Sequence, residues 1–171
     1  MRQRLADLKP LVRAQEEELV NAALISDPDW QDANTVRLFK AVRHELSVVS
    51  ATHAAWRAGT RVCFPRVVAP GVLSLHEVTT WGQLAPGAFG IPEPAPDLPL
   101  VAPASVDIAL VPGLAFGRDG ARLGQGGGFY DRLLPTLGGA SWGVCFSVQV
   151  VAALPRQAHD RPVDRLIHPT I

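Results

Sequence analysis

The hydrophobic residues near the N-terminus follow two different periods. In residues 12–25 they recur three and four positions apart, which places Val20 and Leu24 on the same side of a helix. In residues 35–39 apolar and polar side chains alternate, as they do in a strand with one buried face. The pattern therefore predicts a helix over 12–25 and a strand over 35–39.

A second helix and a second strand are expected directly afterwards. Ser47 is a suitable N-cap, an apolar stripe follows it, and Gly59 is a typical stop signal. Residues 61–68 have the composition of a strand in which Pro65 indicates irregular pairing. A strand, a helix and a strand within about thirty residues form a βαβ unit, which implies a parallel sheet.

The middle of the chain combines one further strand with a long segment rich in proline and glycine. Residues 71–78 are expected to form the strand. Residues 79–105 contain too much Pro and Gly for regular structure, and so long a loop in a compact domain is usually functional or disordered. Trp81 and Phe89 argue against plain disorder. Each is expected in the core or, less often, stacked on a ligand.

Three more elements are expected in the C-terminal part. Residues 106–112 contain an apolar run, which is typical of a central parallel strand. A short helix is predicted at 129–134 and an apolar strand at 141–147. No internal repeat and no second domain is found. The sequence therefore predicts a single α/β domain over residues 1–171, with a Rossmann-like three-layer fold of a mostly parallel sheet flanked by helices.

Composition and charge narrow the possible partners. The chain has 171 residues, of which 47% are hydrophobic and 19% charged, a balance typical of globular proteins. Its formal net charge is zero, so no overall field would attract nucleic acid or an anionic membrane. Lys9 and Lys40 are the only lysines among sixteen Lys and Arg residues. An anion site in this chain must therefore rely on arginine or on backbone donors.

The cysteines and the N-terminus indicate a cytoplasmic protein. Cys63 and Cys145 each lie in an apolar run, which is typical of buried free thiols in a reducing compartment. The N-terminal residues are charged throughout and lack the apolar core of a signal peptide. No apolar run approaches the length of a transmembrane helix. We therefore expect a protein of the cytoplasm that does not act on membranes.

A cluster of glycines is the first candidate for a functional site. Ten of the fifteen glycines lie between Gly113 and Gly143, and seven of these precede a predicted helix whose N-terminus would offer N–H donors to phosphate. Two standard motifs are absent. A Walker A loop needs Gly-Lys-Ser/Thr, and the dinucleotide fingerprint needs a glycine where Phe129 stands. On spacing alone, a phosphate site and a structural loop are equally good interpretations.

Side chains beside the glycines favour the phosphate site. Arg122 precedes them, and a guanidinium holds phosphate oxygens in a fixed geometry. Tyr130 and Asp131 follow in the first turn of the predicted helix. Asp131 is consistent with helix capping. It is also consistent with a Mg²⁺ ligand, because Mg²⁺ typically takes one or two carboxylates together with substrate phosphates.

These residues belong to a longer resemblance. Residues 107–134, DIALVPGLAFGRDGARLGQGGGFYDRLL, resemble the signature of the 5-formyltetrahydrofolate cyclo-ligase family, also called methenyltetrahydrofolate synthetases. The stretches GTRVCFPRV, FGIPEP and SVQVVAALPRQAHDRPVDRLI are similar to other parts of the same family, so the likeness extends from about Thr35 to the end. The combination of P-G-x-A-F, R-L-G-x-G-G-G-[FY]-Y-D and a later His-Asp is specific.

The resemblance implies an ATP- and Mg²⁺-dependent enzyme that converts 5-formyltetrahydrofolate to 5,10-methenyltetrahydrofolate and releases ADP and phosphate. In that reaction ATP phosphorylates the formyl oxygen, and N10 of the folate then closes the ring. Phosphoryl transfer depends on positioning and charge neutralisation more than on a protein nucleophile. Backbone donors, an arginine and a metal therefore suit this chemistry.

The resemblance also implies roles for individual residues. Arg122 would be the catalytic cation, and Asp131 and Asp160 would bind the metal, with Asp164 as a less favoured substitute for Asp160. The implied ATP site comprises Arg122, Leu123, Gly124, Gln125, Gly126, Gly127, Gly128, Phe129, Tyr130 and Arg4. The implied folate site comprises Glu45, Lys40, Gln125, Gly126, Gly127, Gly128 and Phe129.

Some of these residues have a second interpretation. Glu45 precedes a predicted helix and could complement its dipole, which is the commoner role for such an acid. Asp160 precedes Arg161-Pro162 and could be an ordinary turn residue. The five histidines lack metal-ligand spacing, which argues against a zinc site.

The N-terminal part departs from the family pattern. Family members usually begin with a basic helix of the Lys-x-x-Leu-Arg kind, whereas residues 1–33, expected to be helical, are shorter than usual and offer Arg2, Arg4, Lys9 and Arg13. Two alternatives stay open: a non-catalytic folate- or nucleotide-binding relative, and an unrelated Rossmann-like domain with a structural glycine loop. Because Arg122, Asp131 and Asp160 occur together, the enzyme is favoured. The expected partners are reduced folate and ATP, and the chain is expected to be a monomer.

Overall fold

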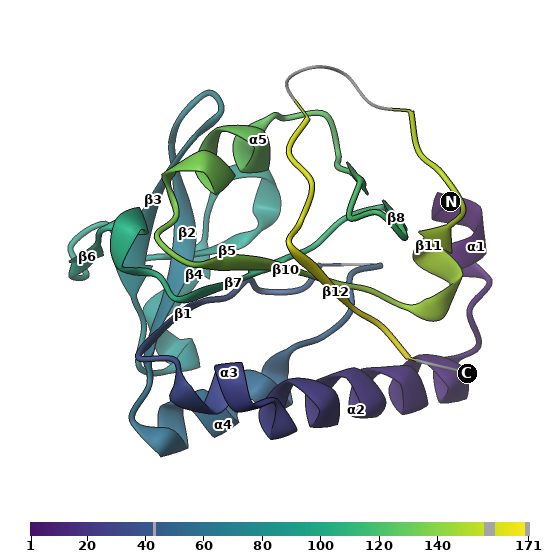
Figure 1. Ribbon diagram of the computed structural model, residues 1–171. Helices are drawn as coiled ribbons and strands as arrows, with labels where there is room; N and C mark the ends of the chain where they lie inside the picture. The colour runs from purple at the N-terminus through teal and green to yellow at the C-terminus, as the bar shows by residue number, and fades with distance from the viewer. Residues whose placement is uncertain (43, 156–159, 170–171) are drawn as a thin grey trace.

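A seven-stranded sheet forms the centre of the protein (Figure 1). The computed structural model describes residues 1–42, 44–155 and 160–169. In spatial order the strands are β12 (Arg165–Ile167), β10 (Ala140–Val144), β7 (Ile108–Val111), β1 (Thr35–Arg37), β2 (Arg61–Ala69), β3 (Val72–Glu77) and β6 (Leu100–Val101). The strands from β12 to β2 are parallel to their neighbours, and the β2–β3 and β3–β6 pairs are antiparallel. The predicted mostly parallel sheet is confirmed.

Helices cover the two faces of this sheet unequally. On one face, the lower one in Figure 1, lie α2 (Pro10–Ser26), α3 (Pro28–Asp32) and α4 (Val49–Ala58). The opposite side carries α5 (Phe129–Leu133), which continues into the 3-10 turn η4 (Leu134–Thr136). The helices predicted over 12–25 and 129–134 are thus confirmed, as is the α/β fold. None of the helices in the described part of the chain is long and apolar enough to span a membrane.

Alternation along β7 explains why both faces are apolar. Ile108 and Leu110 pack toward α2 and α4, whereas Ala109 and Val111 point to the opposite side. A central parallel strand is buried on both faces, so its sequence is a continuous apolar run. The two cysteines lie on the α5 side as buried free thiols, as predicted, and burial raises the pKa of each to about 12.

Two exposed aspartates, Asp107 and Asp164, join segments that are distant in sequence. Asp107 accepts hydrogen bonds from the backbone N–H groups of Asn34 and Thr35, both at 2.8 Å, just before β1. Asp164 accepts from the backbone N–H and the hydroxyl of Ser141 at 2.7 and 2.6 Å. Both carboxylates therefore lie at the amino ends of parallel strands, where they satisfy donors that the sheet ladder leaves free.

The βαβ unit is confirmed with two corrections. The strand predicted over 35–39 has regular pairing only as far as Arg37. Ser47 is not the N-cap of α4; the N-cap is Val48, without a side-chain hydrogen bond. Ser47 instead joins α4 to α2, because its N–H donates to Glu17 and its carbonyl accepts from Asn21. Gly59 ends α4 with a φ of 78°, as the stop signal predicted.

The segment 79–105 is more regular than its composition suggests. It contains the hairpin of β4 (Leu84–Pro86) and β5 (Pro92–Pro94), the edge strand β6, and the 3-10 turns η1 (Trp81–Gln83), η2 (Ala88–Gly90) and η3 (Pro103–Ser105). The prediction of no regular structure is wrong, because tertiary pairing accommodates prolines on these short edge strands. Pro65 lies in β2 beyond the residues that pair with β1; it pairs in register with Leu75 of β3, and the irregularity lies between Val67 and Ala69.

A small second sheet carries the start of the glycine-rich segment. It consists of β11 (Val150–Val151), β8 (Ala115–Gly117) and β9 (Arg122–Leu123), in that spatial order. Gln149, in the 3-10 turn η5 (Ser147–Gln149), donates to the carbonyl of Gly113 at 2.7 Å and so ties this sheet to the chain after β7. The remaining helix, α1 (Arg2–Ala6), packs against η5.

Candidate active site

Two loops that follow adjacent parallel strands contain most of the predicted site residues. The loop after β1 carries Lys40 and Glu45, and the chain after β7 carries the glycine loop, residues 124–128. β1 and β7 pair in parallel, so both loops leave the same edge of the sheet. In open α/β sheets, ligands bind outside this carboxyl edge. The topology therefore brings together two segments that are about eighty residues apart in sequence.

The conformation of the loop requires glycine at particular positions. Gly128 is the N-cap of α5 and has a φ of 62°, a left-handed conformation that side chains with a Cβ adopt only with strain. A Cβ on Gly124 would lie 2.6 Å from Nη1 of Arg122. Gly124 is thus needed for close contact between the loop backbone and the guanidinium of Arg122.

Arg122 is held at the centre of this region. Its side chain is only 5% exposed, and Nη2 forms an ion pair with Oδ1 of Asp131 at 3.2 Å. Its guanidinium carbon lies 5.0 Å from the ring centroid of Tyr130, within the range of a cation–π interaction. Nε of Arg122 is buried and has no hydrogen-bond partner among the described residues. Such a donor is a strong candidate for binding an anion, because leaving it unsatisfied is costly.

The segments that contain Asp131 and Asp160 lie close together in space, although they are distant in sequence. The backbone N–H of Arg161, the residue after Asp160, donates to Oδ1 of Asp131 at 3.4 Å. Asp164 is bonded to Ser141 at the amino ends of the strands, and its carboxylate therefore does not belong to this cluster. Among the described residues, no group of three or more His, Cys, Asp and Glu side chains could hold a metal.

The carboxylates of Asp131 and Asp160 are better suited to Mg²⁺ than to a metal ion that is coordinated by protein ligands alone. They are hard oxygen donors, and Mg²⁺ usually takes one or two carboxylates and fills its other positions with water and substrate phosphates. Asp131 and Asp160 would thus hold the ion against a bound nucleotide. Residues 156–159, which include the His159 of the sequence signature, lie outside the described residues.

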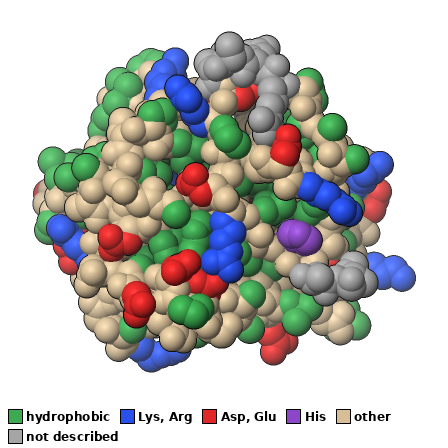
Figure 2. Space-filling model, in the orientation of Figure 1, with side chains coloured by type: hydrophobic (Ala, Val, Ile, Leu, Met, Phe, Trp, Pro, Cys, Tyr) green, Lys and Arg blue, Asp and Glu red, His purple; other side chains and the backbone are tan. Residues whose placement is uncertain are grey.

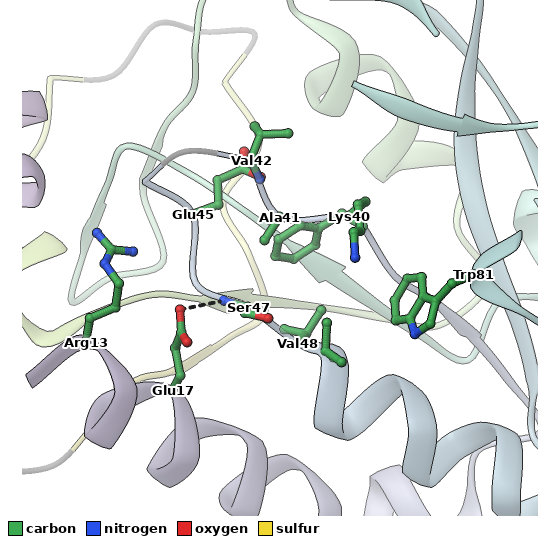
Figure 3. A pocket seen from close by; sticks show the side chains of 11 residues that line it. Arg13, Glu17, Lys40, Ala41, Val42, Glu45, Ser47, Val48 and Trp81 are labelled. Carbon is green, nitrogen blue, oxygen red and sulfur yellow. Dashed lines mark hydrogen bonds between the residues drawn. The ribbon is translucent and has the colours of Figure 1, made fainter. Parts of the chain in front are cut away.

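A cavity of about 210 Å³ lies beside the loop after β1 (Figure 3). Arg13 and Glu17 enter it from α2, Lys40 and Trp81 lie at the other end, and Glu45 lies on the loop between them. The full lining is Arg13, Glu17, Phe39, Lys40, Ala41, Val42, Glu45, Ser47, Val48, Val49 and Trp81. The cavity therefore combines apolar walls with charged groups of both signs, as binding sites for polar aromatic ligands do.

Glu45 is turned away from the helix that follows it. Its Oε2 accepts a hydrogen bond from the backbone N–H of Val42 at 3.1 Å, and no bond to the N-terminus of α4 is present among the described residues. Burial raises the pKa of this carboxyl above its ordinary value, while the hydrogen bond from Val42 and the charge of Arg37 act in the opposite direction. This geometry favours a ligand-binding role over the helix-dipole interpretation.

Lys40 and Trp81 form one end of the cavity. Nζ of Lys40 lies 4.1 Å from a ring centroid of Trp81, and Nε1 of Trp81 donates to Nε2 of His53 at 2.7 Å. The indole also packs edge-on against Trp56 and Phe64. Trp81 therefore packs against the core, as one interpretation predicted, and also lines the cavity; stacking on a ligand stays a prediction.

The residues predicted for the ATP and folate sites do not all lie at one place in the structure. Gln125 is exposed on the glycine loop, and Leu123, 43% exposed, points outward from β9. Arg4 is exposed on α1, which packs against η5. The glycine loop contributes no side chain to the lining of the cavity among the described residues. The predicted residues thus fall into two groups, one around Arg122 and one around Glu45, which we call the Arg122 subsite and the Glu45 subsite.

Three charged residues near these subsites were not assigned to either site from the sequence. Arg13 and Glu17 enter the cavity from the apolar-patterned helix α2, and Arg13 also lies over the ring of Phe146, 4.5 Å from its centroid. Arg37 is completely buried in β1 and donates to Tyr130. A signal for Arg37 was present, since a charge inside the apolar strand TVRLF must find a specific partner when it is buried.

The described residues on the face of the molecule seen in Figure 2 form no large area of one charge. On the face seen in Figure 2, Lys and Arg side chains alternate with Asp and Glu side chains. The formal net charge of zero agrees with this mixture. Long-range attraction of a polyanion is therefore weak here, and local groups have to bind an anionic ligand.

Comparison with known proteins gives a consistent result. The model of the 5-formyltetrahydrofolate cyclo-ligase family matches residues 1–169. The 5-formyltetrahydrofolate cyclo-ligase of Escherichia coli K12 is 31% identical over 182 aligned positions, which cover 99% of this chain and 97% of the relative. The mouse enzyme of the same name is 23% identical, over 98% of this chain and 89% of its own.

Solved structures agree with this relationship. The NMR structure of 5,10-methenyltetrahydrofolate synthetase from Aquifex aeolicus superposes with a TM-score of 0.86 at 35% identity, and the match covers 96% of this chain and 84% of the other. A 5,10-methenyltetrahydrofolate synthetase from Mycoplasma pneumoniae shares the fold, with a TM-score of 0.79 at 19% identity. Because the family model matches almost its whole length and a relative of 31% identity is covered almost completely, the chain belongs to the 5-formyltetrahydrofolate cyclo-ligase family.

Proposed function

We propose that this protein converts 5-formyltetrahydrofolate to 5,10-methenyltetrahydrofolate and, in the same reaction, ATP to ADP and phosphate. The observation that supports the proposal most is the parallel pairing of β1 with β7, because the chain segments that follow these two strands carry Glu45 and Arg122. A reaction between a nucleotide and a second small molecule needs two such adjacent subsites. The family relationship supplies the identity of the two substrates.

The reaction balances in two steps. The formyl oxygen attacks the γ-phosphorus of ATP, the bond to ADP breaks, and the formyl carbon becomes electrophilic. N10 of the folate then attacks this carbon, the carbon–oxygen bond breaks, phosphate leaves, and the proton of N10 is lost to solvent. The first step needs positive charge around the transferred group and a fixed approach of the two reactants.

Arg122 is the residue best placed to supply that charge. Its buried Nε and its contact with the glycine-loop backbone at Gly124 suit it to face the phosphoryl group. The remaining proposed ATP contacts come from the loop itself, from Tyr130 and, more distantly, from Arg4. When bound by Asp131 and Asp160, Mg²⁺ would neutralise charge on the phosphates.

The folate is proposed to bind in the cavity beside this loop. Glu45 would accept hydrogen bonds from N–H groups of the pterin ring, and Trp81 offers an aromatic wall. Lys40 would attract the carboxylates of the folate. The backbone between Gln125 and Phe129 would then lie between the two ligands, where the formyl oxygen and the γ-phosphoryl group have to meet.

An absorbance assay of the purified chain tests the function directly. The methenyl product absorbs where 5-formyltetrahydrofolate does not, so product that requires both ATP and Mg²⁺ is the expected result. ATP and folate that bind without forming product would indicate a non-catalytic relative. No binding of either ligand would contradict the proposal altogether. Omitting ATP or Mg²⁺ in turn provides the controls.

We further propose that the protein acts as a monomer in the cytoplasm and that its partners are the two substrates. The large exposed apolar side chains among the described residues are scattered rather than gathered in one patch: Leu11, Leu19, Val68, Val72, Leu100 and Leu123. Scattered apolar residues are normal on monomeric proteins. The two buried free thiols are those of a protein from a reducing compartment.

A further inference from the structure

Arg37 is an unusual residue for the centre of a parallel sheet. It is the last residue of β1 and its side chain is 0% exposed. Its neighbours in the chain, Val36 and Leu38, pack into the apolar cluster that α2 and α4 cover. Because side chains alternate along a strand, Arg37 points to the other side, toward α5.

The guanidinium of Arg37 joins two elements on that side. Nη1 donates to the backbone carbonyl of Leu110 in β7 at 2.7 Å, and Nη2 donates to the hydroxyl of Tyr130 in α5 at 2.9 Å. The guanidinium carbon also lies 4.7 Å from the ring centroid of Tyr130. Arg37 thus fixes both the hydroxyl and the ring of one side chain against the central sheet.

Tyr130 links Arg37 to Arg122 and to the glycine loop. Its ring contacts two guanidiniums, that of Arg37 at 4.7 Å and that of Arg122 at 5.0 Å. Tyr130 directly follows Gly128 and Phe129 in the chain, so its position also affects the position of the last residue of the glycine loop. A change in the orientation of Tyr130 would move the ring on which Arg122 rests.

The charge of Arg37 is not neutralised by a direct ion pair. Within the ranges that the structure describes, no carboxylate lies within ion-pair distance of its guanidinium, and its Nε has no hydrogen-bond partner. A buried charge without a carboxylate in direct contact costs free energy, and an apolar residue of similar size would often be more stabilising at such a place. Stability alone is therefore a poor explanation for this arginine.

We propose that Arg37 is a positioning residue for ATP binding. It holds Tyr130 against the sheet, and through Tyr130 it keeps Arg122 and the end of the glycine loop in the orientation that receives the phosphates. Its own guanidinium does not touch the nucleotide, but its positive charge lies beneath the subsite and favours a polyanion there. This inference rests on the proposed ATP subsite around Arg122.

Arg37→Met tests the proposal, because methionine replaces the buried stem and removes charge and donors. The loss of a charge-assisted hydrogen bond predicts a dissociation constant for ATP raised about tenfold or more, measured by calorimetry without folate. The affinity for 5-formyltetrahydrofolate should change less than about twofold. Tyr130→Phe, which keeps the ring and loses only the hydroxyl, should weaken ATP binding in the same direction but less.

Two comparisons separate positioning from general damage. Arg66→Met removes a guanidinium that likewise donates to a backbone carbonyl, that of Pro94 at 2.8 Å, and it should leave ATP binding unchanged. In an Arg122→Ala background, Arg37→Met should have little further effect on ATP affinity, since residues that act as one unit are not additive. Arg37→Lys keeps the charge and should restore part of the affinity.

The possible results distinguish this proposal from the assignment of the ATP subsite. If Arg122→Ala weakens ATP binding and a folded Arg37→Met does not, the role of Arg37 is rejected and the subsite stands. If neither variant affects ATP binding, the subsite itself is misplaced. Equal losses for ATP and folate would show that Arg37 has only a structural role. Should Arg37→Met fail to fold, Arg37→Lys decides the question, because lysine keeps the charge but cannot reproduce both hydrogen bonds; ATP affinity equal to that of the wild type would reject the positioning role.

Discussion

Arg122 and Asp131, which are proposed to act on different parts of bound ATP, form an ion pair with each other at 3.2 Å. The pair is largely shielded from water, with exposed fractions of 5% for Arg122 and 21% for Asp131. A cation that binds Asp131 would weaken this pair and leave the guanidinium available for phosphate. In the absence of ligands, each side chain therefore partly neutralises the charge of the other.

Arg122→Ala should abolish turnover. Arginines that stabilise a transferred phosphoryl group contribute about 10³-fold or more to the rate, so a loss of at least that size is expected in kcat/KM. Arg122→Lys keeps the charge but not the two-donor geometry, and it should retain a small part of the activity. Steady-state kinetics and a melting curve of each variant measure these effects. Activity near that of the wild type in a folded Arg122→Ala would remove the residue from the mechanism.

Asp131→Asn should raise the Mg²⁺ concentration needed for half-maximal activity. The substitution preserves size and removes the negative charge, for which a shift of about tenfold or more is expected. Asp164→Asn is the matched control, because that carboxylate is bonded to Ser141 away from the subsite. It should lower the melting temperature without shifting the Mg²⁺ titration. An unchanged titration in Asp131→Asn would restrict Asp131 to pairing with Arg122.

Glu45 predicts a pH dependence of stability. Burial raises the pKa of its carboxyl, so the folded protein keeps a proton there at pH values where the unfolded chain has lost it. The favourable contribution to stability is complete below the ordinary pKa and is lost as the pH rises through the raised pKa. Folate binding should change in the opposite direction, because the charged carboxylate is the better acceptor.

Glu45→Gln separates these two effects. Denaturant unfolding between pH 4 and 7 should show a flatter profile for the variant, which has no titrating group at this position. Its KM for 5-formyltetrahydrofolate should rise about tenfold or more, because an amide is a weaker acceptor for the ring N–H groups. The KM for ATP should stay close to that of the wild type. An unaltered folate KM would return Glu45 to a purely structural role.

At the scale of elements, the two subsites depend on the order of strands rather than on any single motif. β1 lies between β2 and β7 because the βαβ unit built on α4 places β2 on one side of it, and β7 pairs on the other. The loops after β1 and β7 consequently leave the sheet side by side. Short elements then complete the site, namely α5, β8 and β9.

Gly128→Ala and Gly59→Ala form a matched pair of substitutions at helix ends. Both glycines have positive φ, 62° and 78°, so each alanine should cost about 1 kcal/mol of stability through backbone strain. Gly59 ends α4 and has open space around it, whereas Gly128 begins α5 at the proposed ATP subsite. Only Gly128→Ala should raise the KM for ATP. Equal kinetics in the two variants would mean that the loop conformation does not matter for the nucleotide.

At the scale of the whole molecule, the central sheet packs against helices on both faces, and the segments of both proposed subsites follow its strands. The apolar clusters on its two faces meet through alternate residues of the same strands, as β7 shows. The N-terminal helices pack on one of these faces, and Glu16 of α2 accepts hydrogen bonds from the N–H and hydroxyl of Ser147 at 2.8 and 2.6 Å. The N-terminal part is thus joined to the C-terminal strands.

The chain should therefore unfold as one unit. Urea titrations followed by tryptophan fluorescence and by circular dichroism are expected to coincide, because Trp30, Trp56, Trp81 and Trp142 report on both ends of the sheet. Sedimentation should give the mass of a single chain, 18.3 kDa. Two separate transitions would contradict the proposed single domain, and a larger mass would contradict the monomer.

Local patterns in the sequence were sufficient for the main elements. The helix over 12–25, the βαβ unit, the apolar strand β7 and the left-handed stop at Gly59 follow from periodicity and from the conformational freedom of glycine, which are properties of neighbouring residues. Segment 79–105 was predicted wrongly because β4, β5 and β6 exist only through pairing with each other or with β3. Propensity does not contain that information.

The sequence by itself determined the class of fold, the family and the glycine-loop residues, because each of these depends on residue types at fixed spacings. Tertiary structure alone decided that Asp164 lies at the opposite end of the strands, that Arg13 and Glu17 line a cavity with Glu45, and that Arg37 lies behind Tyr130. These facts depend on which strands become neighbours. Strand neighbours are chosen by burial of the whole apolar surface, which no short stretch of sequence specifies.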